Sequence, residues 1–424
     1  MILKKGDRGS LVSLLQLALE RSGYLNSQKD GIFGDKTEAA LRRFQADEGI
    51  SADGIAGRET MLRIKKYITG YTTYTIKSGD TLYNLARQFY STVPLIETAN
   101  PDIFPENLTV GENIIIPYSF KVVPTDIPYS SLLTELVIEG LVARYPFLML
   151  STVGRSVMGK RILMLTVGKG EKTVFANASH HANEWITTPL LLAFIENFSI
   201  KVINAGYIAG YSAEEIFNSR TLYAVPLVNP DGVDLVTDAL DKNSPFYKEA
   251  YDIGARFPDI PFPNGWKANI KGTDLNLNYP ADWQRARELK FAAGFNQPAP
   301  RDYVGTAPLS AIETKNMFSL TLREDFDITI SLHTQGEEIY WQFKNYATEE
   351  SRRLGELMAD VSRYLLTSPP EFSNYAGYKD WFLQNYRRPA YTVEAGRGQN
   401  PLPITDFTGT YPKIEAIMCE ALVW

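Results

Sequence analysis

The sequence predicts a multidomain protein: a small three-helix domain and a small strand–helix–helix–strand domain precede a large α/β domain with a mixed sheet flanked by helices. Its 424 residues exceed the size of one ordinary domain. A short motif repeats near the N-terminus, which is typical of a small unit built from similar turns and helices. After about residue 122, apolar β-rich runs alternate with helical segments, and this alternation indicates an α/β fold.

The composition limits the possible partners and metal ligands. A net charge of -6, without a dense run of Lys and Arg, argues against a nucleic-acid partner. Charged residues and a proline interrupt the most apolar stretch, 132–150, so no membrane partner is expected. The single cysteine, Cys419, excludes an intramolecular disulfide and a cluster of thiolate ligands. Any metal must therefore be held by His and carboxylates.

The repeat lies in the first predicted domain, residues 1–68. The segment DGIFGDKT at 30–37 is echoed by DGIAGRET at 53–60, and each copy is a glycine turn followed by a helix start. An earlier helix is expected over about 10–22. Together with KKGDRGSLVSLLQLAL, the pattern resembles the peptidoglycan-binding domain of bacterial wall hydrolases. The alternative is a helical dimerisation or spacer module.

The second predicted domain spans residues 72–118. Its segments YTIKSGDTLYNLA, ANP and LTVGENIIIP favour a strand, two helices and a strand. This order and these motifs resemble a LysM domain, a family that binds N-acetylglucosamine-containing glycans. The alternative is a linker domain that has lost sugar binding, because no aromatic platform is identifiable in the sequence.

The third predicted domain, residues 122–424, contains all three histidines of the chain. His181 follows an apolar strand and is part of His-x-x-Glu with Glu184, whereas His333 ends another apolar strand. Sites in α/β sheets form at the carboxyl ends of strands, so these three side chains are expected to meet. Two His and one Glu form an open catalytic zinc set, and we expect one Zn²⁺ per domain. The adjacent His180 points the other way along the strand and is expected to be structural.

A third strand end supplies a proton acceptor. Glu394 follows a short β-rich run and precedes a glycine turn. Zinc lowers the pKa of a coordinated water, and a nearby carboxylate must take its proton. We therefore expect Glu394 to act as general base and later as general acid.

This order of motifs resembles the carboxypeptidase A-like zinc peptidases over about three hundred residues. The resemblance implies that Asp274, in an Asp-x-Asn motif, orients His181, with a turn or helix cap as the alternative role. It also implies that Lys267 replaces the arginine that stabilises the oxyanion, although a surface lysine is the alternative. Asn276 of the same motif is expected to bind substrate.

Two departures argue against removal of single C-terminal residues. Leu277 stands where such enzymes carry an arginine that clamps the terminal carboxylate, and Asn183 replaces a further substrate-binding arginine. Residues 266–278 instead resemble the γ-D-glutamyl-meso-diaminopimelate endopeptidases of sporulating bacteria. Arg397, near Glu394, is a candidate partner for a substrate carboxylate, or a solvated loop residue. Tyr375 and Tyr378 are both candidates for a mobile gate.

The sequence therefore predicts a zinc peptidase that hydrolyses the γ-D-glutamyl-meso-diaminopimelate bond of peptidoglycan stem peptides by attack of zinc-bound hydroxide. The alternatives are a carboxypeptidase that trims stem peptides and an inactive wall-binding protein. Residues 1–10 lack the apolar segment and cleavage site of a secretion signal. A cell-wall or spore location, including the cytoplasm of the sporulating cell, is expected. The sequence does not determine the oligomeric state.

Overall fold

The structure is a computed structural model and describes residues 2–424. It divides into two compact units. The N-terminal unit consists of residues 2–127 together with Leu132–Met149, and the C-terminal unit consists of Pro128–Ser131 and Leu150–Trp424. The predicted fold class is confirmed, since two small domains precede an α/β domain with a large mixed sheet. The domain boundaries 1–68, 72–118 and 122–424 stay a prediction.

In the N-terminal unit, each copy of the repeated motif forms hydrogen bonds with the side chain of a buried glutamine. Gln16 Nε2 donates to Asp30 Oδ1 at 2.9 Å, and Gln16 Oε1 accepts from the Gly31 N–H at 2.9 Å. Gln45 repeats the arrangement in the second copy, where its Nε2 donates to Asp53 Oδ1 at 3.1 Å. Gly31 has φ +69°, which favours glycine. The helices that carry and follow these turns are α1 (Ser10–Arg21), α2 (Asp35–Asp47) and α3 (Arg58–Thr69).

A strand–helix–helix–strand segment follows α3. Its two strands pair antiparallel, with Tyr71 opposite Pro117. Thr81 and Thr92 cap the two helices through side chains that accept backbone N–H bonds. The bounds are β1 (Tyr71–Thr75), α4 (Leu82–Gln88), α5 (Val93–Ala99) and β2 (Asn113–Pro117).

Helix α6 (Ser131–Arg144) belongs to the N-terminal unit from Leu132 onward. A Cβ atom added at Gly140 would lie only 2.0 Å from the carbonyl oxygen of Thr69, so the two backbones are in close contact. Arg144, buried near the end of α6, donates to the carbonyl oxygens of Gly70 and Tyr118. The sequence analysis had included this segment in the third domain.

The C-terminal unit is built on one mixed sheet in the order β11-β10-β12-β9-β5-β8-β4-β3. The four neighbours β12, β9, β5 and β8 run parallel, whereas β10 and β4 run antiparallel to them. The central strands β5, β9 and β12 are buried along most of their length, as expected for a sheet that is covered on both faces. The bounds are β3 (Met149–Arg155), β4 (Arg161–Gly168), β5 (Lys172–Ala178), β8 (Arg220–Val225), β9 (Ile328–His333), β10 (Glu338–Tyr340), β11 (Leu365–Thr367) and β12 (Ala390–Glu394).

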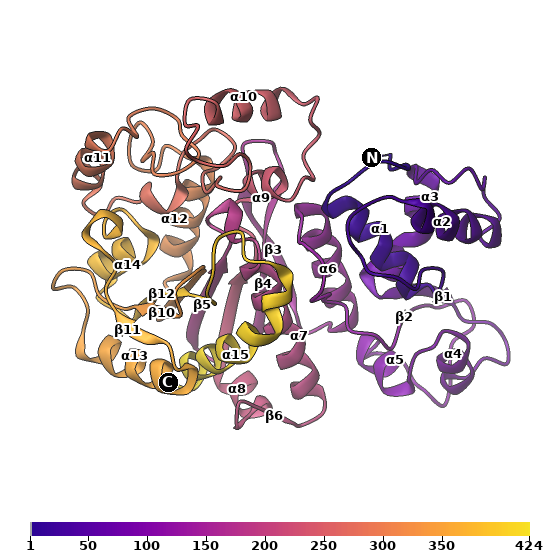
Figure 1. Ribbon diagram of the computed structural model, residues 1–424. Coiled ribbons are helices and arrows are strands. Elements are labelled where there is room, and N and C mark those ends of the chain that lie inside the picture. Colours follow the sequence, from indigo (N-terminus) through magenta and orange to yellow (C-terminus); the bar gives the residue numbers. More distant parts are fainter. Residues whose placement is uncertain (1) are drawn as a thin grey trace. The chain divides into compact units, whose positions relative to one another are not determined.

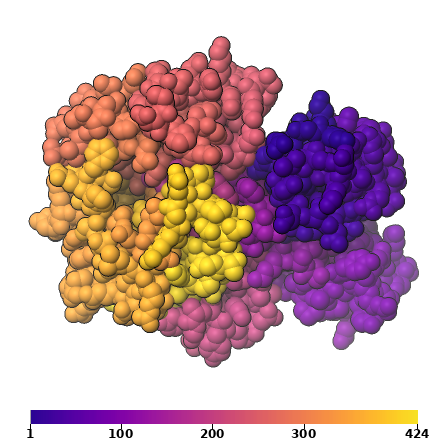
Figure 2. All heavy atoms as spheres, viewed as in Figure 1, coloured from indigo at the N-terminus to yellow at the C-terminus, as the bar shows by residue number. Residues whose placement is uncertain are grey.

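Helices cover both faces of this sheet (Figure 1). On one face, α12 (Ile312–Glu324) and α14 (Tyr378–Tyr386) share a hydrophobic cluster with Phe175 of β5. On the other, α15 (Phe407–Val423) contacts α7 (Thr187–Ile203) and α13 (Glu349–Ser362). Figure 2 shows α15, in yellow, at the surface beside the orange α13.

Helix α7 is buried along most of its length, as expected for a core helix. The stretch Ala182–Ile203 is long and apolar enough to cross a membrane by length and composition alone, but 72% of its most apolar window is buried inside the protein. Smaller elements join the large ones in this unit. They include β6 (Tyr207–Ile208), β7 (Tyr211–Ser212), α8 (Ala213–Ser219), α9 (Pro230–Val236), α10 (Pro245–Gly254) and α11 (Trp283–Ala292).

Candidate active site

The parallel strands β5, β9 and β12 end at one edge of the sheet and carry the predicted site residues there. Glu394 ends β12 directly opposite His333, which ends β9. Beyond β5, Ser179 has φ +51° and turns the chain, so that His181 precedes a short 3₁₀ turn, η1 (Ala182–Glu184). The main-chain N–H of Ala182 donates to the Lys267 carbonyl at 3.0 Å and holds this turn in place.

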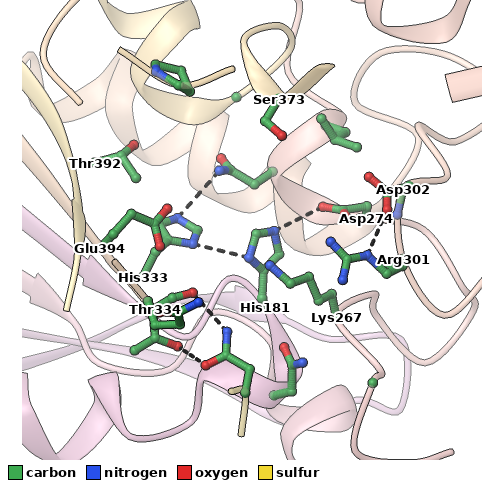
Figure 3. A pocket seen from close by; sticks show the side chains of 18 of the residues that line it. His181, Lys267, Asp274, Arg301, Asp302, His333, Thr334, Ser373, Thr392 and Glu394 are labelled. Atoms are coloured by element: carbon green, nitrogen blue, oxygen red, sulfur yellow. Dashed lines mark hydrogen bonds and ion pairs between the residues drawn. The ribbon is translucent and has the colours of Figure 1, made fainter. Parts of the chain in front are cut away.

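His181, Glu184 and His333 converge on one point. Figure 3 shows the rings of His181 and His333 side by side at this point. One ligand atom from each lies within 4.8 Å of the others. His181 Nδ1 is 3.0 Å from Glu184 Oε1, and His333 Nδ1 is 2.9 Å from Glu184 Oε2. The structure therefore brings together the three residues that the sequence analysis proposed as metal ligands.

The donor set fits a divalent cation such as zinc. His333 Nδ1 and His181 Nδ1 lie 3.2 Å apart beside a carboxylate, so both nitrogens are close enough to bind one ion. A bound cation would take the place of the proton on His181 and use all three groups as ligands. Burial alone would raise the pKa of Glu184, but His181, Lys267 and His333 hold it well below its usual value. The carboxylate is thus ionised, as a metal ligand must be.

Asp274 fixes the orientation of His181. His181 Nε2 lies 3.2 Å from Asp274 Oδ1, which leaves Nδ1 directed at the metal-binding point. Asp274 Oδ2 accepts a hydrogen bond from the Asp302 N–H at 3.1 Å. Burial would raise the pKa of Asp274, but His181 and this N–H bond hold the pKa well below its ordinary value. An ionised carboxylate on the far ring nitrogen selects the tautomer that a metal ligand needs.

Lys267 lies at the base of the site. Its Nζ is 2.9 Å from Glu184 Oε1, so the lysine pairs with one of the three candidate ligands. The preceding Trp266 is fully buried and donates from its indole N–H to the Ala268 carbonyl, which fixes the loop. Burial would lower the pKa of Lys267, but Glu184 and Glu394 raise it above its ordinary value. The structure thus keeps a positive charge beside the metal-binding point.

Glu394 lies across the site from Lys267 (Figure 3). Burial and repulsion from Glu184 raise its pKa to about 8, although Lys267 and His181 oppose the shift. A carboxyl group whose pKa lies near neutrality can take up and release a proton at working pH.

The other predicted residues occupy different places. Asn276 lies near His333, with its Nδ2 3.5 Å from Nε2 of the imidazole, and its Oδ1 accepts from the Tyr378 N–H. Arg397 is 75% exposed and pairs with Glu337 at 2.8 Å, and it is not among the described residues that line the cleft. His180 is buried and faces Tyr279, with 3.0 Å between its Nε2 and the phenol oxygen.

Neither candidate gate tyrosine lines the cleft in the described part of the chain. Tyr378 is fully buried, and its hydroxyl lies 2.8 Å from that of Thr321. Tyr375 packs edge-on against Phe343. Tyr340 of β10 is the tyrosine that lines the cleft instead.

The site opens into a cleft of about 850 Å³ with many charged groups. Several of these groups were not predicted from the sequence, because no motif marks them: Lys290 and Lys379 lie on helices, whereas Arg301 lies on a loop. Lys379 and Asp380 follow the gate candidates and form a buried pair at 2.5 Å. Other lining residues that were not predicted include Asp259, Lys290, Arg301, Asp302 and Asn400.

Three family profiles match the chain. The zinc carboxypeptidase profile matches residues 134–413, the peptidoglycan binding domain profile matches 8–64, and the LysM domain profile matches 74–117. The first match covers well over half of the chain. The chain belongs to the zinc carboxypeptidase family. This zinc carboxypeptidase-family protein is therefore a metallopeptidase by family, with two matched modules before its catalytic part.

Two curated relatives match different stretches of this zinc carboxypeptidase-family protein. It is 40% identical over 295 residues to gamma-D-glutamyl-L-diamino acid endopeptidase 1 of Lysinibacillus sphaericus, which covers 69% of this chain and 72% of the relative. It is 35% identical over 82 residues to a spore cortex-lytic enzyme of Oceanobacillus iheyensis, which covers 19% of this chain and 30% of that one.

A solved structure supports the fold. The thrombin activatable fibrinolysis inhibitor superposes with a TM-score of 0.54 at 19% identity, over 70% of this chain and 77% of that one. At this level of identity the likeness concerns the fold of the zinc carboxypeptidase domain alone.

Proposed function

We propose that this protein is a zinc peptidase that hydrolyses the γ-D-glutamyl-meso-diaminopimelate bond of peptidoglycan stem peptides. The observation that carries the proposal is the convergence of His181, Glu184 and His333 beside Glu394 in a strongly charged cleft. The name of the Lysinibacillus sphaericus relative supports the choice of bond. The charged lining suits a substrate that carries several carboxylates and amines.

The proposed chemistry divides among six side chains and the metal. His181, Glu184 and His333 would hold zinc, which supplies Lewis-acid chemistry that polarises the scissile carbonyl and acidifies the attacking water. Glu394 accepts the proton of that water on a carboxylate oxygen and passes it to the leaving amine of diaminopimelate. Lys267 presents its ammonium to the developing oxyanion. Asp274 keeps His181 in the ligating tautomer.

Leu277 supports cleavage within the stem over trimming of its end. Its side chain lines the cleft, and a leucine cannot form the paired hydrogen bonds that clamp a terminal carboxylate. An endopeptidase and a carboxypeptidase release different products from the stem, so identification of the released product distinguishes the two activities.

The matched N-terminal modules support a wall-bound or spore-associated location. We propose that the residues matched to the peptidoglycan binding and LysM profiles bind peptidoglycan and keep the catalytic unit near its substrate. Tethering raises the local substrate concentration without any new contact in the cleft. The spore cortex-lytic relative supports a role in sporulating cells.

The test is mass spectrometry of the products formed from L-Ala-γ-D-Glu-meso-diaminopimelate-D-Ala by the zinc-loaded protein. We expect L-Ala-D-Glu from the wild type, none from Glu394→Gln, and normal release from Glu356→Gln, an exposed glutamate on α13. Release of D-Ala alone would instead establish a carboxypeptidase. Zinc binding without any product would favour an inactive wall-binding protein.

A further inference from the structure

Arg301 lines the cleft from the loop between α11 and α12 and is held in place through one end of its guanidinium group. Its Nε donates to Asp302 Oδ2 at 2.7 Å. The other oxygen of Asp302 accepts from Lys290 Nζ at 2.5 Å. Two cations thus share one carboxylate, so the group of Lys290, Asp302 and Arg301 carries one net positive charge.

The loop is also tied to the candidate metal centre. The main-chain N–H of Asp302 donates to Asp274, the residue that orients His181. The loop that carries Arg301 is therefore connected to a candidate metal ligand, His181, through Asp302 and Asp274. A side chain held in this way loses little conformational freedom when it binds a ligand.

The other end of the guanidinium group is available to a ligand. Within residues 2–424, the two terminal nitrogens of Arg301 have no hydrogen-bond partner, and the side chain is 42% exposed. Two parallel N–H groups match the two oxygens of a carboxylate, which makes this the preferred geometry for binding a planar anion.

The position of Arg301 indicates which part of a substrate it reaches. In Figure 3, Arg301 and Lys267 lie on one side of His181, whereas Glu394 lies on the other side, beyond His333. Glu394 must contact the leaving amine in order to protonate it, so the amine half of the substrate lies toward Glu394. The acyl half then lies toward Lys267 and Arg301.

We propose that Arg301 binds the α-carboxylate of the D-glutamyl residue whose γ-carbonyl is attacked. This assignment rests on the proposed function. A γ-linked glutamyl residue carries a free α-carboxylate on the acyl side of the scissile bond. In an ordinary α-linked residue the α-carboxyl group is itself part of a main-chain amide, so no free α-carboxylate is present. Arg301 is therefore the residue that distinguishes a γ-glutamyl bond from an α-linked peptide bond.

The test compares two substrates that differ in one group. They are L-Ala-γ-D-Glu-meso-diaminopimelate and its analogue with a carboxamide at the glutamyl α-position. We expect the wild type to prefer the carboxylate. Arg301→Ala should lower kcat/KM for the carboxylate substrate by about tenfold to a hundredfold, the usual effect of losing hydrogen bonds to a charged group, and leave the carboxamide almost unaffected.

Two further variants separate charge from geometry and from general damage. Arg301→Lys keeps the charge without the fork and should recover only part of the preference. Arg323→Ala removes an exposed arginine of α12 and should change neither substrate. An equal loss on both substrates in Arg301→Ala, or no loss on either, would overturn the assignment.

A binding measurement keeps this assignment separate from the proposed function. If the wild type hydrolyses neither substrate, the proposed function fails. Calorimetry with the zinc-loaded protein and L-Ala-D-Glu, or its α-carboxamide, still tests Arg301 directly. Tighter binding of the carboxylate that Arg301→Ala abolishes supports the assignment, and equal binding of both ligands contradicts it.

Discussion

The imidazole of His181 and the carboxylate of Asp274 lie 3.2 Å apart, although 93 residues separate them in the chain. This contact connects the turn after β5 with the loop that carries Arg301, because Asp274 also accepts the N–H of Asp302. The orientation of one candidate ligand and the position of the proposed carboxylate-binding loop therefore depend on the same side chain.

Loss of this contact should weaken metal binding. Asp274→Asn keeps the size of the side chain but removes the charge that selects the ligating tautomer of His181. We expect the zinc affinity to fall by about tenfold to a hundredfold, as for other groups that orient a metal ligand. Competition with a chromogenic chelator measures this, with Asp360→Asn on the exposed face of α13 as the control. An unchanged affinity would mean that Asp274 acts only as a turn residue.

Metal binding should release protons. Burial lowers the pKa of His181, but Glu184 and Asp274 raise it to about 9 in the metal-free protein, so the ring is protonated at pH 7. A ligating imidazole must be neutral, and the zinc affinity should therefore rise with pH up to about 9. Calorimetry in buffers of different ionisation enthalpy gives the number of protons released. A zinc affinity that does not depend on pH between 6 and 8 would count against His181 as a ligand.

Glu394 should be needed for turnover and not for metal binding. Glu394→Gln removes the proton acceptor, and general base catalysis contributes about 10²–10⁴-fold to the rate. We expect a loss of kcat in this range with one zinc ion retained, as measured by product release and by atomic absorption. A variant that lost its zinc as well would show that Glu394 supports the metal site.

Lys267 should act mainly in the transition state. Lys267→Met keeps an apolar stem of similar length but removes the ammonium group. We expect kcat to fall by about 10²–10³-fold with a smaller change in KM, as when one oxyanion donor is removed. Lys271→Met, which removes an exposed lysine paired with Glu249, serves as the control. A loss confined to KM would place Lys267 in substrate binding alone.

The close approach of α6 to Thr69 should matter for stability. Gly140→Ala introduces a Cβ atom that would meet the Thr69 carbonyl oxygen at 2.0 Å, and we expect a destabilisation of about 1–3 kcal/mol from the resulting strain. Gly409→Ala on α15 is the matched control, because no atom lies within 4 Å of its added Cβ. Thermal unfolding followed by circular dichroism separates the two variants. Equal melting temperatures would contradict this account of the contact.

The sequence by itself determined the fold class and identified the candidate metal ligands. Both depend on local order in the chain: strands end at or shortly before His181, His333 and Glu394, and parallel strands place their ends at one edge of a sheet. The three-residue spacing of His181 and Glu184 is likewise local, because a single turn brings both side chains to the same point.

Only the tertiary structure decided where α6 packs, that Arg397 turns to Glu337, and that Arg301 lines the cleft. These outcomes depend on loops whose course is fixed by contacts with distant segments, such as the bond from Asp302 to Asp274. A loop carries no periodic pattern that could predict its direction. The charges on the cleft wall therefore follow from packing, whereas the candidate metal ligands follow from the ends of the strands.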